Sequence, residues 1–291
     1  MITRNNNKIM KKRKRVDLFA HSLFFLSTIA SIVVLFILIY DISSDGFGWL
    51  SKAFFQNFPS RFAAKSGIKP ALIGSVWIIG LTALFSIPVG IGAAIYLEEY
   101  AKNNWFKKFI VINIANLAGV PSIVYGMLGL TIFVRALGFG RSILSGALTM
   151  SLLILPIIIV ASQEAIRSVS DAIKAGSYAL GATKWQTITK IIIPSALPGM
   201  LTGIIFAISR ALGETAPLLM VGAFSYISTL PKGPMDSFVV LPIQIYMWAG
   251  RPQEDFRGIA AAGIIVLLVL LLTSNGIAIF LRNKYQVRSE E

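Results

Sequence analysis

The sequence of 291 residues contains no cysteine and only one histidine, His21. Disulfides, thiolate metal sites and cysteine nucleophiles are therefore excluded, and the single histidine has no second one with which to share a metal. The sequence also lacks the phosphate-loop motif G-x-x-x-x-G-K-[ST] and the hydrolase motifs G-x-S-x-G and H-E-x-x-H. We therefore expect no metal site, no enzymatic activity and no ATP hydrolysis in this chain.

Acidic residues are scarce as well, with 13 Asp and Glu against 27 Lys and Arg. Most of these acids stand in polar stretches or at the edges of apolar runs, as Glu98 and Glu99 do. We interpret those two as solvated residues. Glu214 is the exception, because it lies inside an apolar run.

Apolar residues dominate what is present: they make up 55% of the chain, and its mean hydropathy is +0.74. Several runs exceed the ~20 residues with which a helix crosses a bilayer. Because backbone polar groups need partners in lipid, such runs form helices. We predict an all-α, polytopic membrane protein with six transmembrane helices, over residues 18–40, 71–97, 109–134, 142–161, 199–223 and 258–281.

The net charge of +14 is unevenly distributed between the connecting segments. If the amino terminus is cytoplasmic, most of the Lys and Arg residues fall on the cytoplasmic side, as the positive-inside rule requires. We expect both termini in the cytoplasm, a first span retained as an anchor, and a plasma-membrane location. The basic cluster at residues 11–15 favours anionic lipid headgroups over nucleic acid as its partner.

Residues 174–198, KAGSYALGATKWQTITKIIIPSALP, form a polar and basic segment between two apolar runs. A first helix is expected to end at Gly181, because glycine adopts left-handed conformations cheaply. Thr183 and Gln186 have the spacing of a capping box that opens a second helix, which two later prolines bend or end. The segment is either an ordinary helical loop or a docking element for a soluble cytoplasmic partner.

The fifth predicted span carries two charges, Arg210 and Glu214, one helical turn apart. Charges at membrane depth are costly and usually face the bundle interior or a water-filled path. A helical projection puts them on one face with Gly199, Gly203 and Ala207, whose spacing predicts close contact with another helix. The pair either locks the bundle or lines a translocation path where the guanidinium binds an anion.

The third predicted span is irregular at residues 119–129, GVPSIVYGMLG. Proline removes a helix hydrogen bond, and the glycines loosen the neighbouring turns. Broken helices in transporters line cavities. Ser122 and Tyr125 are therefore candidates for the same path, or they simply bond neighbouring backbone.

The segment 174–198 resembles the signature of the binding-protein-dependent ABC-transporter permeases. In that family a glycine is followed ten residues on by Ile-x-Leu-Pro, and here Gly181 is followed by Ile-Ile-Ile-Pro at 191–194. The family motif begins with an acid at the position of Ala175, so that acid is missing. More narrowly, GVPSIVYG (119–126), YALGATKWQTI (178–188) and RALGETAPLL (210–219) resemble the permeases of PstA type from phosphate-specific ABC transporters.

This resemblance implies a type I importer fold and an ATP-driven phosphate importer of bacteria or archaea. The partners it implies are a second similar permease, two ATPase subunits that bind ATP and Mg²⁺, and an external phosphate-binding protein. It implies a permease domain at 71–282, preceded by the basic region, first helix and exterior loop (1–70) and followed by a tail (283–291). The ATPase-coupling loop, at about 162–198, has as candidate contacts Ala175, Gly176, Ser177, Tyr178, Ala179, Gly181, Ala182, Thr183 and Trp185.

Other functions remain open at this point. A permease of the same fold could carry another oxyanion, such as sulfate, molybdate or phosphonate. The chain could also be a membrane sensor or scaffold that binds a regulator without transport. A secondary transporter is less favoured, because no inverted repeat with paired broken helices is visible.

Overall fold

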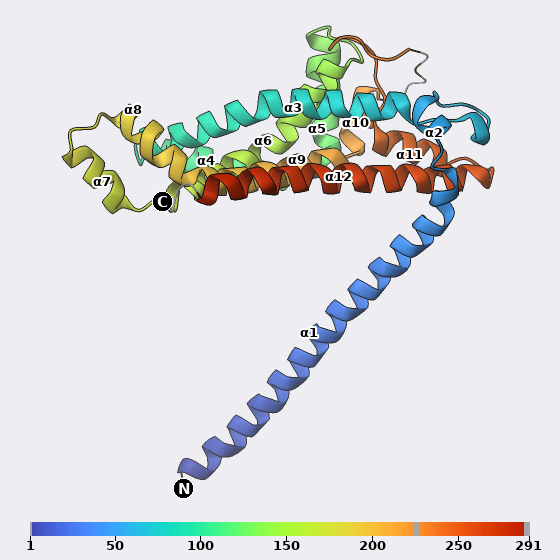
Figure 1. Ribbon diagram of the computed structural model, residues 1–291. Coiled ribbons are helices and arrows are strands. Elements are labelled where there is room, and N and C mark those ends of the chain that lie inside the picture. Colours follow the sequence, from blue (N-terminus) through green and yellow to red (C-terminus); the bar gives the residue numbers. More distant parts are fainter. Residues whose placement is uncertain (1, 224–226, 228, 288–291) are drawn as a thin grey trace.

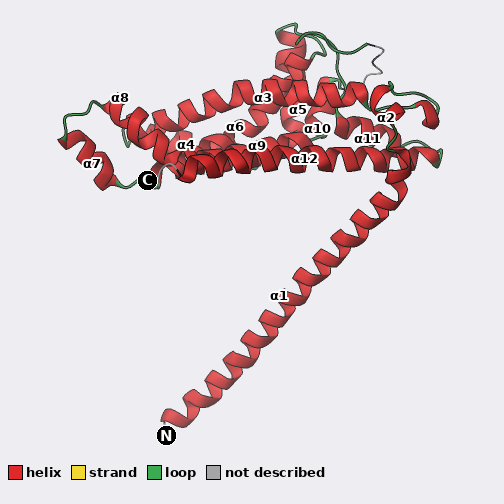
Figure 2. Ribbon diagram, in the orientation of Figure 1, coloured by secondary structure: helices red, strands yellow, loops and turns green. Residues whose placement is uncertain are grey.

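A computed structural model describes residues 2–223, 227 and 229–287 of the chain. These residues form helices and connecting loops without a β-strand (Figure 2). Five helices are long and apolar enough to cross a membrane, and a sixth candidate is a pair of helices separated by a sharp bend. The prediction of an all-helical membrane protein is confirmed.

The long helices lie side by side in an elongated bundle, with the exception of the first (Figure 1). The bundle helices are α3 (Lys69–Ile95), which continues as a π-helical turn η3 (Tyr96–Tyr100), α6 (Ile143–Arg167), α9 (Ile193–Gly213) and α12 (Asp255–Val287). Helix α6 is the most buried of them, because 67% of the residues in its apolar stretch are buried inside the structure. The core therefore forms around α6.

The third predicted span is not one helix. It consists of α4 (Trp105–Leu117), α5 (Ser122–Gly129) and a π-helical segment η4 (Leu130–Ala136), and the two halves meet at 102°. Pro121 precedes α5 in an extended conformation. A proline disfavours helical geometry at the residue before it and donates no hydrogen bond of its own, so the break falls where the sequence predicts irregularity.

The fifth predicted span needs correction at both ends. The helix begins earlier, because α8 (Lys184–Thr187), a π-helical turn η5 (Ile188–Ile192) and α9 run on as one helix through both prolines. It also ends earlier, at Gly213, and a short α10 (Ala216–Val221) follows. Pro217 lies at the start of α10, where its ring would clash with a helical carbonyl four residues back, which accounts for the early end.

The small residues of α9 contact α6, which confirms the close helix contact expected from their spacing. A Cβ atom added at Gly203 would lie 2.2 Å from Cβ of Ala161, and one at Gly199 would lie 2.9 Å from Cβ of Ala165. Ala207 is fully buried. Small side chains let these two helices approach closely in the absence of any hydrophobic drive within lipid.

Short helices and loops close one end of the bundle. They are η1 (Phe47–Trp49), α2 (Lys52–Gln56), η2 (Ala63–Lys65) and α11 (Leu241–Ala249). Phe54 and Trp248 are buried there with ring centroids 6.0 Å apart. The opposite end carries α7 (Asp171–Ala179) and α8 (Figure 1).

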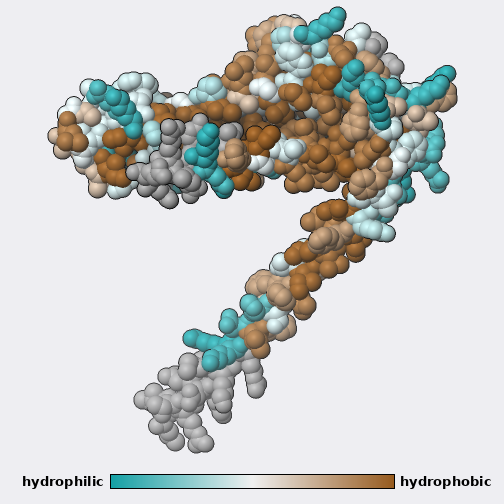
Figure 3. Space-filling model, in the orientation of Figure 1, coloured by the Kyte–Doolittle hydropathy of each residue, from teal (hydrophilic) through white to brown (hydrophobic). Residues whose placement is uncertain are grey.

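Helix α1 (Ile2–Gly46) projects away from the bundle (Figure 1). This helix is apolar enough to span a bilayer, and none of the residues in its apolar stretch is buried against the rest of the chain. Its last residue, Gly46, packs tightly on Ala261 and Ala262 of α12. Figure 3 shows apolar residues along its middle and polar ones nearer its start, as expected for a segment surrounded by lipid.

Candidate coupling loop and membrane site

The loop between α7 and α8 has a helix end that its sequence specifies closely. Gly181 has a φ of +84°, the left-handed conformation predicted for it. The backbone N–H of Ala182 donates to the carbonyl of Ser177, and that of Gly181 donates to the carbonyl of Tyr178. These two bonds form a Schellman motif, which satisfies the last carbonyls of α7.

The second helix of the loop begins with the predicted capping box. The backbone N–H of Gln186 donates to Oγ1 of Thr183, and the N–H of Thr183 donates to Oε1 of Gln186 at 2.8 Å. The two helices are joined by a buried hydrogen bond of 2.9 Å between the hydroxyls of Ser177 and Thr187. Helices α7 and α8 therefore form one structured unit with defined geometry.

Apolar side chains of this loop face outward. Leu180 is 91% exposed and Trp185 is 63% exposed, and Ile173 and Tyr178 are also exposed. Exposed apolar groups clustered on a polar loop are typical of a protein interaction surface. Of the candidate contacts, Ser177 is buried and Ala182 is half-buried, and the rest are exposed, namely Ala175, Gly176, Tyr178, Ala179, Gly181, Thr183 and Trp185.

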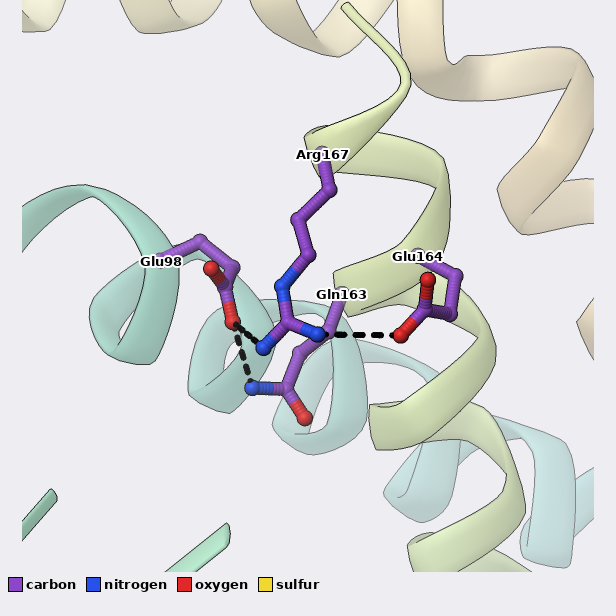
Figure 4. Close-up of polar contacts among 4 residues, drawn as sticks. All are labelled: Glu98, Gln163, Glu164 and Arg167. Carbon is purple, nitrogen blue, oxygen red and sulfur yellow. Dashed lines mark hydrogen bonds and ion pairs between the residues drawn. The ribbon is translucent and has the colours of Figure 1, made fainter. Parts of the chain in front are cut away.

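Two acids that the sequence analysis interprets as solvated are in fact half-buried and paired at the base of this loop. The side chain of Glu98 is only 11% exposed. Its Oε1 accepts from Nη2 of Arg167 at 2.7 Å and from Nε2 of Gln163 at 2.7 Å, while Arg167 also contacts Glu164 (Figure 4). Glu98 therefore links the end of α3 to the last turn of α6.

The neighbouring acid, Glu99, reaches a different element. Its Oε1 lies 2.9 Å from Nζ of Lys174 on α7, and its side chain is only 9% exposed. One sequence signal pointed to these contacts: a pair of adjacent acids at the end of an apolar run, in a chain whose connecting segments are rich in bases. Without knowledge of the fold, that signal cannot say which base each acid meets.

Arg210 and Glu214 of the fifth span form an ion pair although the helix ends between them. Glu214 follows the last residue of α9 in an extended conformation, so the helical projection fails beyond Gly213. Nε of Arg210 nevertheless lies 3.3 Å from Oε1 of Glu214, with side chains 35% and 19% exposed. The pair sits at a helix end beside a non-helical stretch, where backbone groups and charges can face a cavity or a neighbouring subunit.

The broken third span lies close to this pair. Gly126 of α5 packs against the backbone of Pro217 in α10, so the segments 119–126 and 210–219 meet in space. Tyr125 is buried, and its hydroxyl donates to the carbonyl of Leu117 at 2.8 Å. The same carbonyl accepts from the backbone N–H of Val120 at 3.1 Å, so Tyr125 adds a second hydrogen bond at the end of α4 and ties α5 to it.

A cavity of about 240 Å³ lies beneath the break, lined by apolar residues of α4, α5 and α6 together with Tyr125. Its apolar walls do not suit an anion. Ser122, at the first position of α5, is half-buried. The structure thus brings Tyr125 and Arg210 into neighbouring elements, and the transport roles predicted for Ser122 and Tyr125 stay predictions.

The long apolar helices, the broken span and the structured polar loop define a multi-pass helical membrane protein of the transporter class. The family model described as "Binding-protein-dependent transport system inner membrane component" matches residues 86–286. The chain belongs to that family. This match includes the loop, the broken span and the charged pair.

Relatives of known name extend the similarity to most of the chain. "Probable ABC transporter permease protein YqgI" of Bacillus subtilis (strain 168) is 34% identical, over 90% of this chain and 94% of its own length. "Phosphate transport system permease protein PstA 1" of Mycobacterium tuberculosis is 32% identical, over 93% of this chain and 90% of its own length. The PstA protein of Yersinia pestis is also 32% identical, over 85% of this chain.

Solved structures show the same fold. The structure titled "Crystal structure of bacterial alginate ABC transporter in complex with alginate pentasaccharide-bound periplasmic protein" matches with a TM-score of 0.66, covering 92% of this chain and 94% of the matched one at 17% identity. A structure of the MetNI methionine ABC transporter matches with a TM-score of 0.58 over 73% of this chain. The fold is that of the type I ABC importer permeases.

Proposed function

We propose that this chain is the permease subunit of an ATP-driven importer of inorganic phosphate. The similarity to permeases named for phosphate transport, at 32% identity over 93% of the chain, carries this proposal. All three segments that resemble PstA-type permeases lie in the matched region. The relatives of known name thus favour phosphate over the other oxyanions.

The geometry of the coupling loop supports a role beside a soluble ATPase. Its two capped helices present exposed apolar side chains, and its backbone is held by a Schellman motif and a capping box. A preorganised loop loses little conformational entropy on docking. We propose that two ATPase subunits bind ATP and Mg²⁺, and that one of them contacts this loop from the cytoplasm.

The remaining partners follow from the same proposal. A second, similar permease completes the path, and an external phosphate-binding protein delivers the anion to the opposite end of the bundle. Both termini are then cytoplasmic, α1 lies in the plasma membrane, and its basic start contacts anionic lipid. We propose that Arg210 and Glu214 line the phosphate path. The guanidinium of Arg210 can bind an oxyanion through two hydrogen bonds, and Glu214 is its ion-pair partner.

Uptake of labelled phosphate by vesicles that hold the complete complex tests the function. We expect uptake that needs ATP inside, needs the binding protein outside and disappears when this subunit is omitted. Excess unlabelled phosphate should compete, whereas sulfate, molybdate and phosphonate should not. Absence of labelled phosphate uptake by a complex that imports one of those anions would identify a different cargo, and unchanged uptake without this subunit would contradict a permease role.

A further inference from the structure

Three consecutive residues of the turn η3 each contact a different helix through their side chains. Glu98 pairs with Arg167 and Gln163 of α6, and Glu99 pairs with Lys174 of α7. The ring of Tyr100 lies beneath the ammonium group of Lys184, with Nζ 4.7 Å from the ring centroid, and Lys184 begins α8. We call these three residues and their partners the η3 clamp.

The position of the clamp is informative because η3 is the direct continuation of α3. Helix α3 packs along α6 through the core, where Gly90 lies against Ile158 and Thr82 donates to the carbonyl of Ala147. A force on η3 therefore acts on the two central helices of the bundle at once. Glu98 strengthens this connection, since it fixes the end of α3 to the end of α6 (Figure 4).

Helix α7 has little apolar anchorage of its own. None of its residues belongs to the buried apolar clusters found in the described part of the chain, and a Cβ added at Gly176 would meet open space. Its contacts are polar: the ion pair from Lys174 to Glu99 and the hydrogen bond from Ser177 to Thr187. The ion pair is well shielded, with side chains 18% and 9% exposed, so solvent screens it less than a surface pair.

We propose that the η3 clamp transmits movement of the coupling loop to α3 and α6, and that Glu99 and Lys174 are the positioning residues of that link. This inference rests on the proposed function, because it requires an ATPase that moves the loop. Side chains as long as these keep their charges together while the backbones shift. The link joins the loop to a transmembrane helix of the same chain. Its loop residue, Lys174, directly precedes Ala175, the position at which the family motif has an acid.

Neutralising one partner tests the link in the reconstituted complete transporter. We expect Glu99→Gln to assemble normally but to lose about tenfold in phosphate imported per ATP hydrolysed, because Lys174 then keeps only the exposed Asp171 of its own helix, 4.0 Å away, and has no charged partner on η3. The charge swap of Glu99→Lys with Lys174→Glu should recover most of this loss. Parental uptake per ATP in Glu99→Gln, or an assembled swap without recovery, would overturn the proposal.

Glu164→Gln is the matched control. Glu164 contacts the same Arg167 at 3.0 Å, but it lies on the same helix and its side chain is 65% exposed. This substitution removes a charge from the same region without cutting a link between elements. We expect it to keep parental uptake per ATP, and a loss equal to that of Glu99→Gln would mean that local charge, not the link, matters.

A cysteine pair separates coupling from assembly, and the absence of native cysteine in this chain makes it clean. The double change Glu99→Cys with Lys174→Cys removes both charges and so leaves neither unpaired. Joined by a reducible bifunctional thiol reagent, in a complex whose other subunits lack reactive cysteines, the variant should be coupled, and reduction should uncouple it. Equal coupling before and after reduction would overturn the proposal.

The readout also separates this inference from the cargo. Stimulation of ATP hydrolysis by the loaded binding protein can be measured whatever anion the complex carries. If the parental complex shows stimulation but imports no phosphate, the proposed cargo is wrong and the clamp can still be tested. If stimulation is the same in the parent and in Glu99→Gln, the clamp proposal is wrong whatever the cargo.

Discussion

The two ends of the bundle are built in different ways. At the end that carries α2 and α11, backbones and rings are in direct contact. A Cβ added at Gly74 would lie 2.1 Å from the carbonyl oxygen of Val239, and one at Gly258 would lie 2.1 Å from the indole nitrogen of Trp49. The buried backbone N–H of Leu241 donates to the hydroxyl of Ser75 at 2.9 Å.

At the end that carries the coupling loop, α3, α6, η5 and α9 share a small buried apolar cluster, but α7 is attached to them through polar side chains. Glu98 and Glu99 reach Arg167 and Lys174 across gaps between elements, and a Cβ added at Gly181 would meet open space. Close-packed interiors transmit strain and resist small displacements. Ion pairs between long side chains instead keep two elements connected while their backbones shift, so they can link a moving element to the bundle. The difference indicates that one end holds its geometry while the other is built to be moved.

The largest effect should come from a substitution that disturbs the movable end alone. Gly181→Val forces a β-branched residue into a left-handed conformation, which costs about 1–2 kcal/mol, and adds a side chain to the docking surface. We expect normal membrane insertion with loss of transport or of ATPase binding. Uptake by vesicles and co-purification of the ATPase measure the two effects.

Gly138→Val is the control for backbone strain. Gly138 has a φ of +70° and open space around its position, as Gly181 does, but it lies in the loop between η4 and α6. We expect this variant to keep ATPase binding and coupling. Parental transport by Gly181→Val would show that the loop does not dock as proposed, and equal losses in both variants would assign the effect to strain.

Much of the fold could be predicted because lipid imposes strict rules on the chain. Runs of apolar residues give the spans, and Gly181, Thr183 and Gln186 predict the cap geometry of the loop correctly. These signals are local: each depends on residues a few positions apart. For the same reason the packing of Gly203 on another helix could be expected, although not the identity of its partner, Ala161.

The error at the two acids arose because distant segments decide the outcome there. Glu98 and Glu99 are shielded from solvent only because the ends of α6 and α7 partly cover them, and no local pattern shows this. The projection of the fifth span failed for a different reason: Pro217 ends the helix at Gly213, and this local signal was left out of a prediction based on hydropathy. Local rules therefore predict the elements better than they predict the charged contacts between them.

The charged pair at the end of α9 belongs to neither end of the bundle, and it is either a structural contact or part of the anion path. If Arg210 and Glu214 only neutralise each other, Arg210→Leu combined with Glu214→Leu should restore what each single change loses, since no unpaired charge remains. We expect instead that the double variant assembles and fails to import phosphate, because the proposed path has lost the guanidinium that would bind the anion. Uptake by vesicles measures this, with the single variants as controls. Uptake by the double variant above that of both singles would make the pair a structural contact.

The smallest effect is expected at the rigid end, in an exposed turn. The pKa of Asp236 lies below its ordinary value, because the backbone N–H groups of Lys232 and Gly233 donate to its carboxylate at 2.7 and 2.9 Å. Since the folded pKa is the lower one, the stabilisation is present above the ordinary value of about 3.9 and is lost as the pH falls through the lowered value. The backbone of this turn also accepts a hydrogen bond from the N–H of Ile143 at the start of α6. We expect Asp236→Asn to speed hydrogen exchange of the two amides at neutral pH, to remove the acid dependence of their protection and to leave uptake unchanged. An Asn variant that kept the parental acid dependence would show that another group controls the turn.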